Sequence, residues 1–202
     1  MNPQNLNWLN VIEKKMSSQA IIICEKRIHL FQSLNQILKK QKEKLPKIQI
    51  YTNSEIEERL ICTPALKIED EISEKLFSNR KIDGLIGKTQ YSAINSDFKI
   101  KNFDKNTDAK DCSTGEQKVI LLTLFFSFIK LLKHYKVTEI IFLLDDIFSN
   151  LDNRYVDLVL KSLRNLNIQT WITDIKMETI NKDSQVYGDT KFINIEDMKV
   201  KN

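Results

Sequence analysis

Two apolar segments, the second of which ends in a pair of aspartates, constrain the fold of this sequence most. The first, residues 119–132, is 14 residues long. That is shorter than the roughly 20 residues needed to span a bilayer, so we expect a helix buried inside a protein. The second, at residues 139–146, predicts a strand buried on both faces, because continuous apolar runs are typical of parallel sheets in α/β proteins.

The segments around this block predict the other elements. Apolar residues at steps of three, four and seven in the first forty residues indicate a long amphipathic helix or a helical hairpin. We also expect helices at 55–60, 68–80 and 153–165, and strands at 48–52, 169–173 and 191–195. Strand, helix and strand after residue 139 follow the βαβ order of an α/β protein.

Five lysines cluster around Pro46, where we expect the first helix to end. Cations near a helix C-terminus complement its dipole, and we favour this interpretation. The alternative is a patch that contacts phosphate. The net charge of +4 is compatible with an anionic partner such as nucleic acid, but it also suits many enzymes. The lysines are Lys39, Lys40, Lys42, Lys44 and Lys47.

The cysteines and the N-terminus indicate a cytoplasmic protein. Three cysteines without C-x-x-C spacing support neither a disulfide framework nor a zinc site, so a reducing compartment is expected. The polar start of the chain has no apolar core of a secretory signal. We therefore expect no membrane partner.

The turn before the long apolar helix is the first candidate site. Ser113 and Glu116 form an S-x-x-E capping box, which by itself gives a purely structural explanation. Gly115 is not needed for capping and costs about 1 kcal/mol relative to alanine in a helix, but it would let a ligand approach the backbone. A helix N-terminus with a serine hydroxyl and a glycine is suited to receive phosphate.

The aspartates after the second apolar segment are the second candidate site. An apolar strand that ends in two carboxylates is a Walker B arrangement. The first carboxylate binds Mg²⁺ through water and the second orients or deprotonates an attacking water. The alternative is a strand that simply ends in acidic turn residues. However, Asp145 and Asp146, with Asp152 nearby, would repel one another unless a cation or a function justified them.

In this order, the motifs resemble the RecF family, SMC-like ATPases of bacterial DNA repair. CSTGEQK resembles the family's ABC signature, LLDD its Walker B motif and SNLD its D-loop, and WITD follows after the next helix. The resemblance covers essentially the whole chain and is strongest after Asp111. Residues 8–38 resemble part of the family's helical lobe.

The resemblance implies roles for nine residues. Asp145 would bind Mg²⁺ through water, and Asp146 would be the catalytic carboxylate. The residues that would contact the γ-phosphate of ATP held by a second subunit are Ser113, Gly115 and Gln117. The residues that would line the dimer seam are Ser149 and Asp152. The position that other ABC-type heads give to a switch histidine is held by Thr173 and Asp174.

The resemblance also implies fold and function. The fold is α/β, the C-terminal part of an ABC-type ATPase head with a mostly parallel sheet. Residues 1–45 would be a fragment of the helical lobe and residues 46–202 the head. The function would be that of a RecF-like DNA replication and repair protein. It would bind single-stranded or gapped DNA and ATP in a dimer, act with recombination-mediator proteins, and promote recombinase loading and SOS induction.

No Walker A loop is recognisable. The nearest candidate, residues 82–89, has Gly-Lys-Thr but Ile82 at the position of the first glycine, and a charged helix is expected before it. By the resemblance, Lys88 and Thr89 instead begin a strand that leads to the family's Gly-Pro-His-Arg-type motif, here replaced by residues 92–95. We expect that the chain alone neither binds ATP tightly nor hydrolyses it, and that it is a truncated, split or mis-started product.

Two other functions remain as alternatives. The chain could be a non-enzymatic remnant, or the partner subunit of a separately encoded N-terminal half. A transporter ATPase subunit would share the signature and Walker B motifs, but it would usually have Glu at position 146 and a histidine after the next strand. Asp146 and Thr173 therefore disfavour the transporter.

Overall fold

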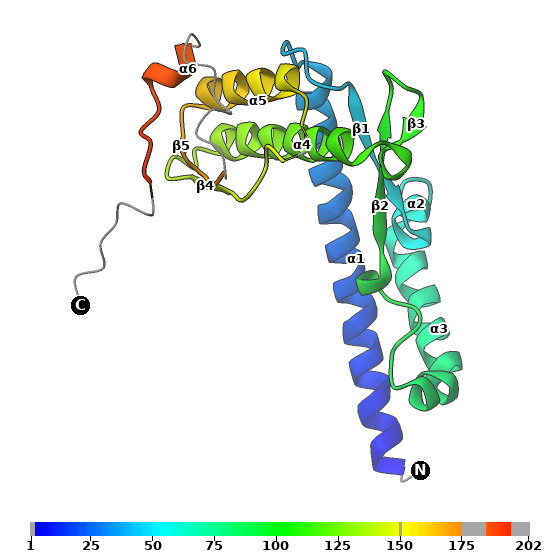
Figure 1. Cartoon of the computed structure of the whole chain (residues 1–202). Helices are drawn as coiled ribbons and strands as arrows, with labels where there is room; N and C mark the ends of the chain where they lie inside the picture. The colour runs from blue at the N-terminus through cyan, green and yellow to red at the C-terminus, as the bar shows by residue number, and fades with distance from the viewer. Residues whose placement is uncertain (1–2, 150, 175–184, 195–202) are drawn as a thin grey trace, which may run out of the picture. The chain divides into compact units, whose positions relative to one another are not determined.

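The computed structural model describes residues 3–149, 151–174 and 185–194 (Figure 1). The chain divides into two compact units. Unit 1 consists of Met1–Gln36 and Ile48–Lys101, and unit 2 of Ile37–Lys47 and Asn102–Asn202. The functional division into a lobe at 1–45 and a head at 46–202 stays a prediction.

The elements of unit 1 are mostly helical. The first helix is continuous, α1 (Pro3–Lys39), so a helical hairpin is not formed. It ends seven residues before Pro46, and the expectation that Pro46 ends it is therefore wrong. The remaining elements are β1 (Ile48–Asn53), α2 (Glu55–Leu60), α3 (Ala65–Ile86), the 3-10 turn η1 (Ala93–Asn95) and β2 (Asp97–Asn102).

A small apolar core holds unit 1 together. Ala20, Ile21 and Cys24 of α1 are buried in one cluster with side chains of α2 and α3. Helix formation places residues three and four apart on one face, so this stripe of α1 meets a matching stripe on α3. The buried residues of α3 are Ile68, Ile72 and Leu76.

One buried carboxylate joins the elements of unit 1. Arg27 of α1 donates to Glu57 of α2 at 3.2 Å and to the carbonyl oxygen of Ala93 at 2.6 Å. The hydroxyl of Ser96 donates to the other oxygen of Glu57 at 3.1 Å. Burial acts to raise the pKa of Glu57, but hydrogen bonds from Ser54, Ser96 and Cys24 outweigh it, so the pKa lies below its ordinary value.

Unit 2 contains the βαβ arrangement expected after residue 139. Strands β4 (Ile141–Leu144) and β5 (Gln169–Ile172) are parallel, and Leu144 lies opposite Ile172. The helix between them is α5 (Asn153–Leu166). The other elements are β3 (Thr107–Asp108), the 3-10 turn η2 (Ala109–Asp111), α4 (Thr114–His134) and α6 (Gln185–Gly188). In unit 1, strands β1 and β2 are neighbours in a second sheet.

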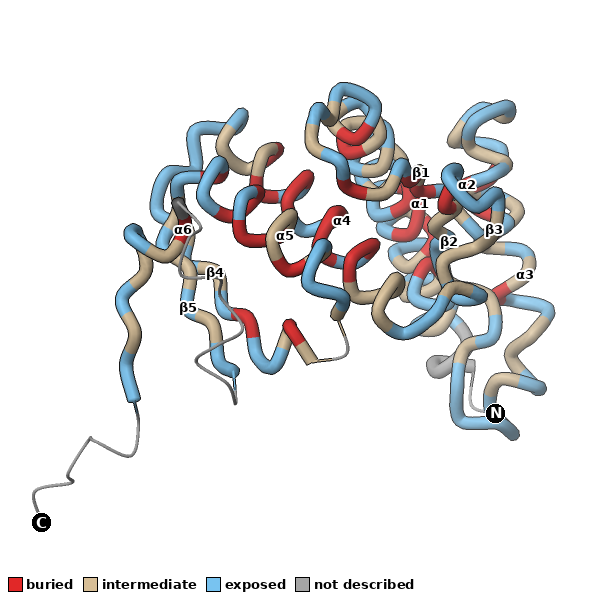
Figure 2. The backbone as a smooth tube through the Cα atoms, turned by 45° about the horizontal axis from the view of Figure 1, so that its top comes forward, coloured by how far each residue is buried: buried red, intermediate tan, exposed pale blue. Residues whose placement is uncertain are grey.

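Helices α4 and α5 lie side by side and cover one face of the β4–β5 sheet (Figures 1 and 2). Phe126 of α4 packs edge-on against Phe142 of β4, with ring centroids 6.4 Å apart. Figure 2 shows buried positions along both helices. The residues of α4 and α5 in this core are Val119, Leu122, Phe126, Ile129, Val156, Val159, Leu160, Leu163 and Leu166.

The opposite face of the β4–β5 sheet is exposed. Ile141, Leu143 and Trp171 are 62%, 71% and 52% exposed, and we call these three residues the uncovered face. The expectation of a strand buried on both faces is therefore wrong, because helices cover a single side of the sheet in the described part of unit 2. Likewise, α4 is not fully buried: one stripe of it, at Leu121, Phe125 and Phe128, is exposed.

Other expectations are confirmed or corrected by the structure. The helices predicted at 55–60, at 68–80, over the apolar segment 119–132 and at 153–165 are present. No strand forms at residues 191–194, and residue 195 lies outside the described residues. Lys88 and Thr89 do not begin a strand, because β2 starts at Asp97. None of the helices in the described ranges combines the length and the apolar character needed to cross a membrane.

Candidate functional site

The two aspartates lie where two parallel strands end together. The backbone N–H of Thr173, just after β5, donates to the carbonyl oxygen of Leu144 at 2.9 Å. The Thr173 hydroxyl donates to the Asp145 carboxylate and accepts the backbone N–H of Asp146 at 3.0 Å. One hydroxyl thus uses its donor and an acceptor to fix both aspartates against the neighbouring strand.

The turn after β4 has an unusual backbone at Asp146. Its φ of 46° lies in the left-handed region, which aspartate tolerates better than most residues. Phe148 is buried in the core of unit 2 and so anchors the turn to that core. Asp145 and Asp146 are both exposed, which leaves their carboxylates accessible to ions and water.

Lys118, near the start of α4, connects that end of the helix to the loop after β4. Its Nζ donates to the carbonyl oxygens of Asp146 and Ser149, at 3.2 and 2.9 Å, and to the Ser149 hydroxyl at 2.6 Å. That hydroxyl in turn donates to the Asp146 carbonyl oxygen at 3.0 Å. Sequence reasoning gave Lys118 no role. The available signal was its position, because it is the last charged residue before the long apolar segment.

The start of α4 forms the predicted capping box. The Ser113 hydroxyl accepts the N–H of Glu116 at 3.4 Å, and the Glu116 carboxylate accepts the N–H of Ser113 at 3.2 Å. An ion pair and hydrogen bond from Lys105, together with the Ser113 N–H, hold the pKa of Glu116 below its ordinary value. Ser113 thus engages Glu116 through both its backbone and its side chain.

Gln117 makes its contacts within its own loop. Its Nε2 donates to the carbonyl oxygens of Lys110 and Cys112, at 2.9 and 3.1 Å. Both amide hydrogens are therefore in use, and a contact with phosphate requires at least one of these bonds to be given up. Gly115 lies half-buried in the first turn of the helix.

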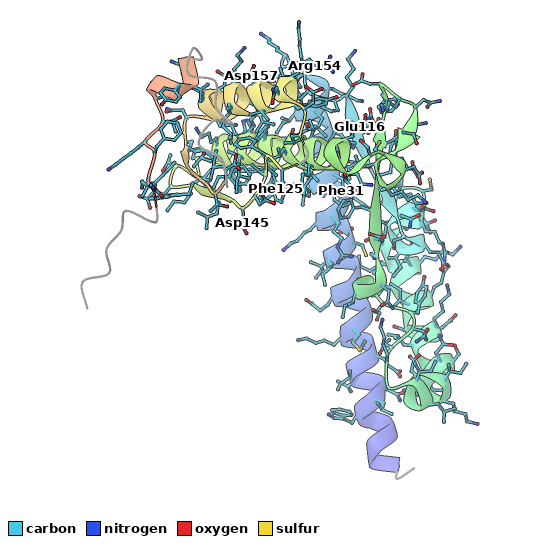
Figure 3. All side chains as sticks on the ribbon, in the orientation of Figure 1. Phe31, Glu116, Phe125, Asp145, Arg154 and Asp157 are labelled. Carbon is cyan, nitrogen blue, oxygen red and sulfur yellow. The ribbon has the colours of Figure 1, made fainter. Side chains whose placement is uncertain are left out.

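The two D-loop residues have different surroundings. Ser149 belongs to the group bound by Lys118. Asp152 caps α5 by accepting the Arg154 N–H at 2.9 Å, and it forms an ion pair with the Arg154 guanidinium at 3.2 Å. These two interactions, the backbone hydrogen bond first, lower the pKa of Asp152. Figure 3 labels Glu116 on α4, Asp145 after β4 and Arg154 on α5.

The structure thus brings Asp145, Asp146, Thr173 and Ser149 into one hydrogen-bonded group and places Asp174 directly after it. In the described ranges, no three His, Cys, Asp or Glu side chains gather as a self-contained metal site. The two aspartates nevertheless fit the implied Mg²⁺, because this ion commonly binds one or two carboxylates and completes its shell with water and substrate phosphate.

The Gly-Lys-Thr triplet lies outside this group and has the wrong local structure for a phosphate loop. Residues 82–86 belong to α3, and Gly87 ends that helix with a φ of 71°. A P-loop places Lys and Thr at the start of a helix, where N–H groups point at the phosphates. Here Lys88 and Thr89 follow a helix end, so the described residues around the triplet form no phosphate cradle.

Comparison with known proteins identifies RecF proteins as relatives. The chain is 32% identical over 179 residues to the DNA replication and repair protein RecF of Rickettsia canadensis, which covers 88% of this chain and 49% of that protein. It is 32% identical over 177 residues to RecF of Rickettsia conorii, covering 87% of this chain and 48% of the relative. The chain therefore spans about half the length of these curated relatives. No protein-family model matches it.

A structural comparison gives the same neighbour. The solved structure of "the recombination mediator protein RecF-ATPrS in RecFOR pathway" superposes with a TM-score of 0.59 at 20% sequence identity. The match covers 84% of this chain and 46% of the solved chain. The resemblance to RecF is confirmed, and the chain corresponds to the C-terminal part of these relatives. The predicted α/β fold with a helical N-terminal region is confirmed as well, and it matches the fold of the solved RecF chain.

Proposed function

We propose that this chain, which corresponds to the C-terminal part of RecF proteins, provides the signature and Walker B half of an ATPase head in DNA replication and repair. The observation that carries the proposal is the bonding of Lys118 to the loop that holds Asp146 and Ser149. The turn at the start of α4 and the acidic loop after β4 are thereby held in a fixed position relative to each other, which the proposed roles of both segments require.

In this proposal each residue of the site has its own role. Asp145 would hold Mg²⁺ through water, and Asp146 would orient or deprotonate the attacking water. Thr173 sets the direction of the Asp145 carboxylate through its hydroxyl. Ser113, Gly115 and Gln117 face the γ-phosphate of ATP held by another subunit. The Mg²⁺ would neutralise the charge that develops on the phosphates.

The phosphate-binding loop must come from elsewhere in the assembly. In this proposal an N-terminal half in trans supplies it, and Ser149 and Asp152 would lie at the seam with a second copy of the head. The uncovered face supports this, because exposed apolar patches commonly mark protein–protein contacts. We propose cytoplasmic location, binding of single-stranded or gapped DNA, and cooperation with recombination-mediator proteins in recombinase loading and SOS induction.

A non-enzymatic remnant is the second candidate. It is favoured by Gln117, because both of its amide hydrogens are bound to carbonyl oxygens of its own loop. A transporter ATPase subunit has no such support, since Asp146 and Thr173 stand where that class usually has Glu and His.

The test is nucleotide turnover in the presence of an N-terminal half. The purified chain alone is expected to show neither tight ATP binding nor hydrolysis. Co-purified with the N-terminal half of the Rickettsia canadensis relative, or with the product of its own upstream reading frame, it should hydrolyse ATP. Asp146→Asn should abolish hydrolysis. Glu139→Gln, an exposed carboxylate before the other end of β4, should leave it unchanged.

Three outcomes decide between the candidates. Hydrolysis lost in Asp146→Asn and kept in Glu139→Gln supports the ATPase. Stable complexes that bind no nucleotide favour the remnant. Hydrolysis by the chain alone, abolished by Asp146→Asn, would show that a phosphate loop supplied from outside is unnecessary.

A further inference from the structure

The positive charge of this protein is concentrated in one short segment. The whole chain carries 31 Lys and Arg against 27 Asp and Glu, a net charge of +4. Residues 39–47, which we call the lysine segment, carry five lysines against one glutamate, which is also +4. The rest of the chain is therefore neutral in sum. All five lysines are exposed: Lys39, Lys40, Lys42, Lys44 and Lys47.

One buried side chain and two hydrogen bonds fix the lysine segment to the rest of unit 2. Leu45 is buried in the core of that unit, in the same cluster as Phe126. The backbone N–H of Lys47 donates to the Asp104 carboxylate at 2.9 Å, and the Phe103 N–H donates to the Lys47 carbonyl oxygen at 2.8 Å. The buried Leu45 and the two hydrogen bonds at Lys47 thus fix the backbone at the C-terminal end of the segment.

The one acidic side chain of the segment does not neutralise the lysines beside it. Lys130 of α4 donates to the Glu43 carboxylate at 2.8 Å. Partial burial acts to raise the pKa of Glu43, but this hydrogen bond and backbone N–H groups outweigh it, so the pKa lies below its ordinary value. Glu43 is thus ionised at neutral pH and paired with a residue outside the segment.

The helix dipole explains part of the cluster at most. Helix α1 ends at Lys39, and the dipole's effect falls off within the last turn. Lys42, Lys44 and Lys47 lie beyond that turn in non-helical backbone. In the described ranges, no ion pair of 4 Å or less links any of the five lysines to a carboxylate. Their charge is therefore available to an external anion.

We propose that the lysine segment binds the phosphate backbone of nucleic acid. This rests on the proposed function and assigns its DNA contact to a definite surface. Exposed lysines act as point charges that contact phosphates without reading bases. The five lysines lie within nine residues of chain, and one strand of a duplex offers a phosphate about every 3.4 Å along the axis. Several phosphates are therefore within reach at once.

The test is the salt dependence of DNA binding by the full chain. Fluorescence anisotropy with a labelled gapped duplex is measured without nucleotide at several salt concentrations. The patch variant is Lys40→Gln/Lys42→Gln/Lys44→Gln. The control variant, Lys136→Gln/Lys161→Gln/Lys191→Gln, removes three exposed lysines of the same unit and therefore the same charge. Circular dichroism verifies that both variants fold.

We expect the patch variant to bind about 10-fold more weakly or worse at low salt, uniformly across DNA sequences. The slope of log K against log salt should become shallower by about 2 to 3, at roughly 0.9 for each phosphate that the variant no longer neutralises. The control should keep the slope of the unaltered chain. The same segment should bind a single strand with a somewhat shallower slope.

Several results would overturn the proposal. One is an equal loss in both variants, which would mean that net charge alone matters. Another is unchanged DNA binding in the patch variant. A third is loss of binding to phosphatidylserine vesicles or to polyglutamate with DNA binding intact, which would assign the segment to a lipid surface or an acidic protein. Because no nucleotide is present, these results are independent of the ATPase test.

Discussion

Unit 1 encloses an ionised side chain, whereas unit 2 leaves apolar side chains of its sheet in solvent. In unit 1, Glu57 is buried and bound by Arg27 and Ser96, which come from elements on either side of it. In unit 2, the buried residues form a larger apolar cluster, yet Leu143 and Trp171 of its sheet are more than half exposed.

The difference lies in what holds each unit together. A buried charge is tolerated when its partners come from the same fold, and Arg27 and Ser96, which bind Glu57, both belong to unit 1. An apolar sheet face in water gains nothing from exposure and indicates a missing neighbour. The contrast predicts that the stability of unit 1 depends strongly on its polar network. The stability of unit 2 should depend on its apolar core, which covers only one face of the β4–β5 sheet.

The largest effect is expected in the core of unit 2. Phe126→Ala should lower the free energy of unfolding by about 3–5 kcal/mol, because it leaves a cavity under the β4–β5 sheet. Phe128→Ala, two residues further along α4 and 37% exposed, is the control and should cost clearly less. Urea denaturation measures both. Equal losses would mean that the exposed stripe of α4 is buried in solution.

The next effect tests the polar network of unit 1. Glu57→Gln should cost about 2 kcal/mol at pH 7, below the usual range for breaking a buried ion pair, because the Arg27 side chain is 34% exposed. Glu55→Gln, a carboxylate of the same helix that is half-exposed, should cost little. Hydrogen exchange resolved by peptide should place the loss in unit 1.

The pH dependence of that variant has a definite sign. Folding lowers the pKa of Glu57 below its ordinary value of 4.5, so the ionised form stabilises the fold above that pH. The stabilisation is lost as the pH falls through the lowered value. The gap between the unaltered chain and Glu57→Gln should therefore narrow below about pH 4. A gap that stays constant from pH 7 to pH 3 would contradict the assignment.

A smaller effect is expected from the link between α4 and the acidic loop. Lys118→Met keeps the stem of the side chain but removes hydrogen bonds to Asp146 and Ser149, and should cost about 1–2 kcal/mol. Exchange of the amides at residues 145–149 should accelerate. Lys161→Met, an exposed lysine of α5, should change neither quantity. Unchanged exchange in Lys118→Met would mean that the loop is held by Thr173 alone.

The parts of the fold that the sequence predicts are those set by local periodicity. The start of α4 at the S-x-x-E box and the limits of α2 and α5 follow from capping and from apolar spacing, which act within one or two turns. The βαβ order after residue 139 was predicted as well, and it brings the carboxyl ends of β4 and β5 to one edge of the sheet.

The parts that could not be predicted depend on interactions between distant residues. An apolar run of five residues does not indicate whether one face of the strand or both faces are covered, which is why the exposure of Leu143 was missed. The roles of Lys118 and Glu57 could not be predicted for a related reason. A lysine or glutamate on a helix is usually solvated, and the partners that bind these two come from distant loops or from other helices.

The smallest effect on stability, and the sharpest test of the open side, lies at two adjacent residues of β4. Leu143→Gln should change the free energy of unfolding by no more than about 0.5 kcal/mol, because the side chain is already in water. Leu144→Gln, one position along, should cost several kcal/mol, because that side chain is 7% exposed and an unpaired amide would be buried. Since the two changes share their chemistry and their strand, the ratio of the two costs reports only which face is covered.

If a second copy or an N-terminal half covers Leu143 in solution, Leu143→Gln will weaken that association in sedimentation experiments while the unfolding of the isolated chain stays unchanged. A loss of stability in Leu143→Gln as large as in Leu144→Gln, in the isolated chain, would show that the face is covered from within.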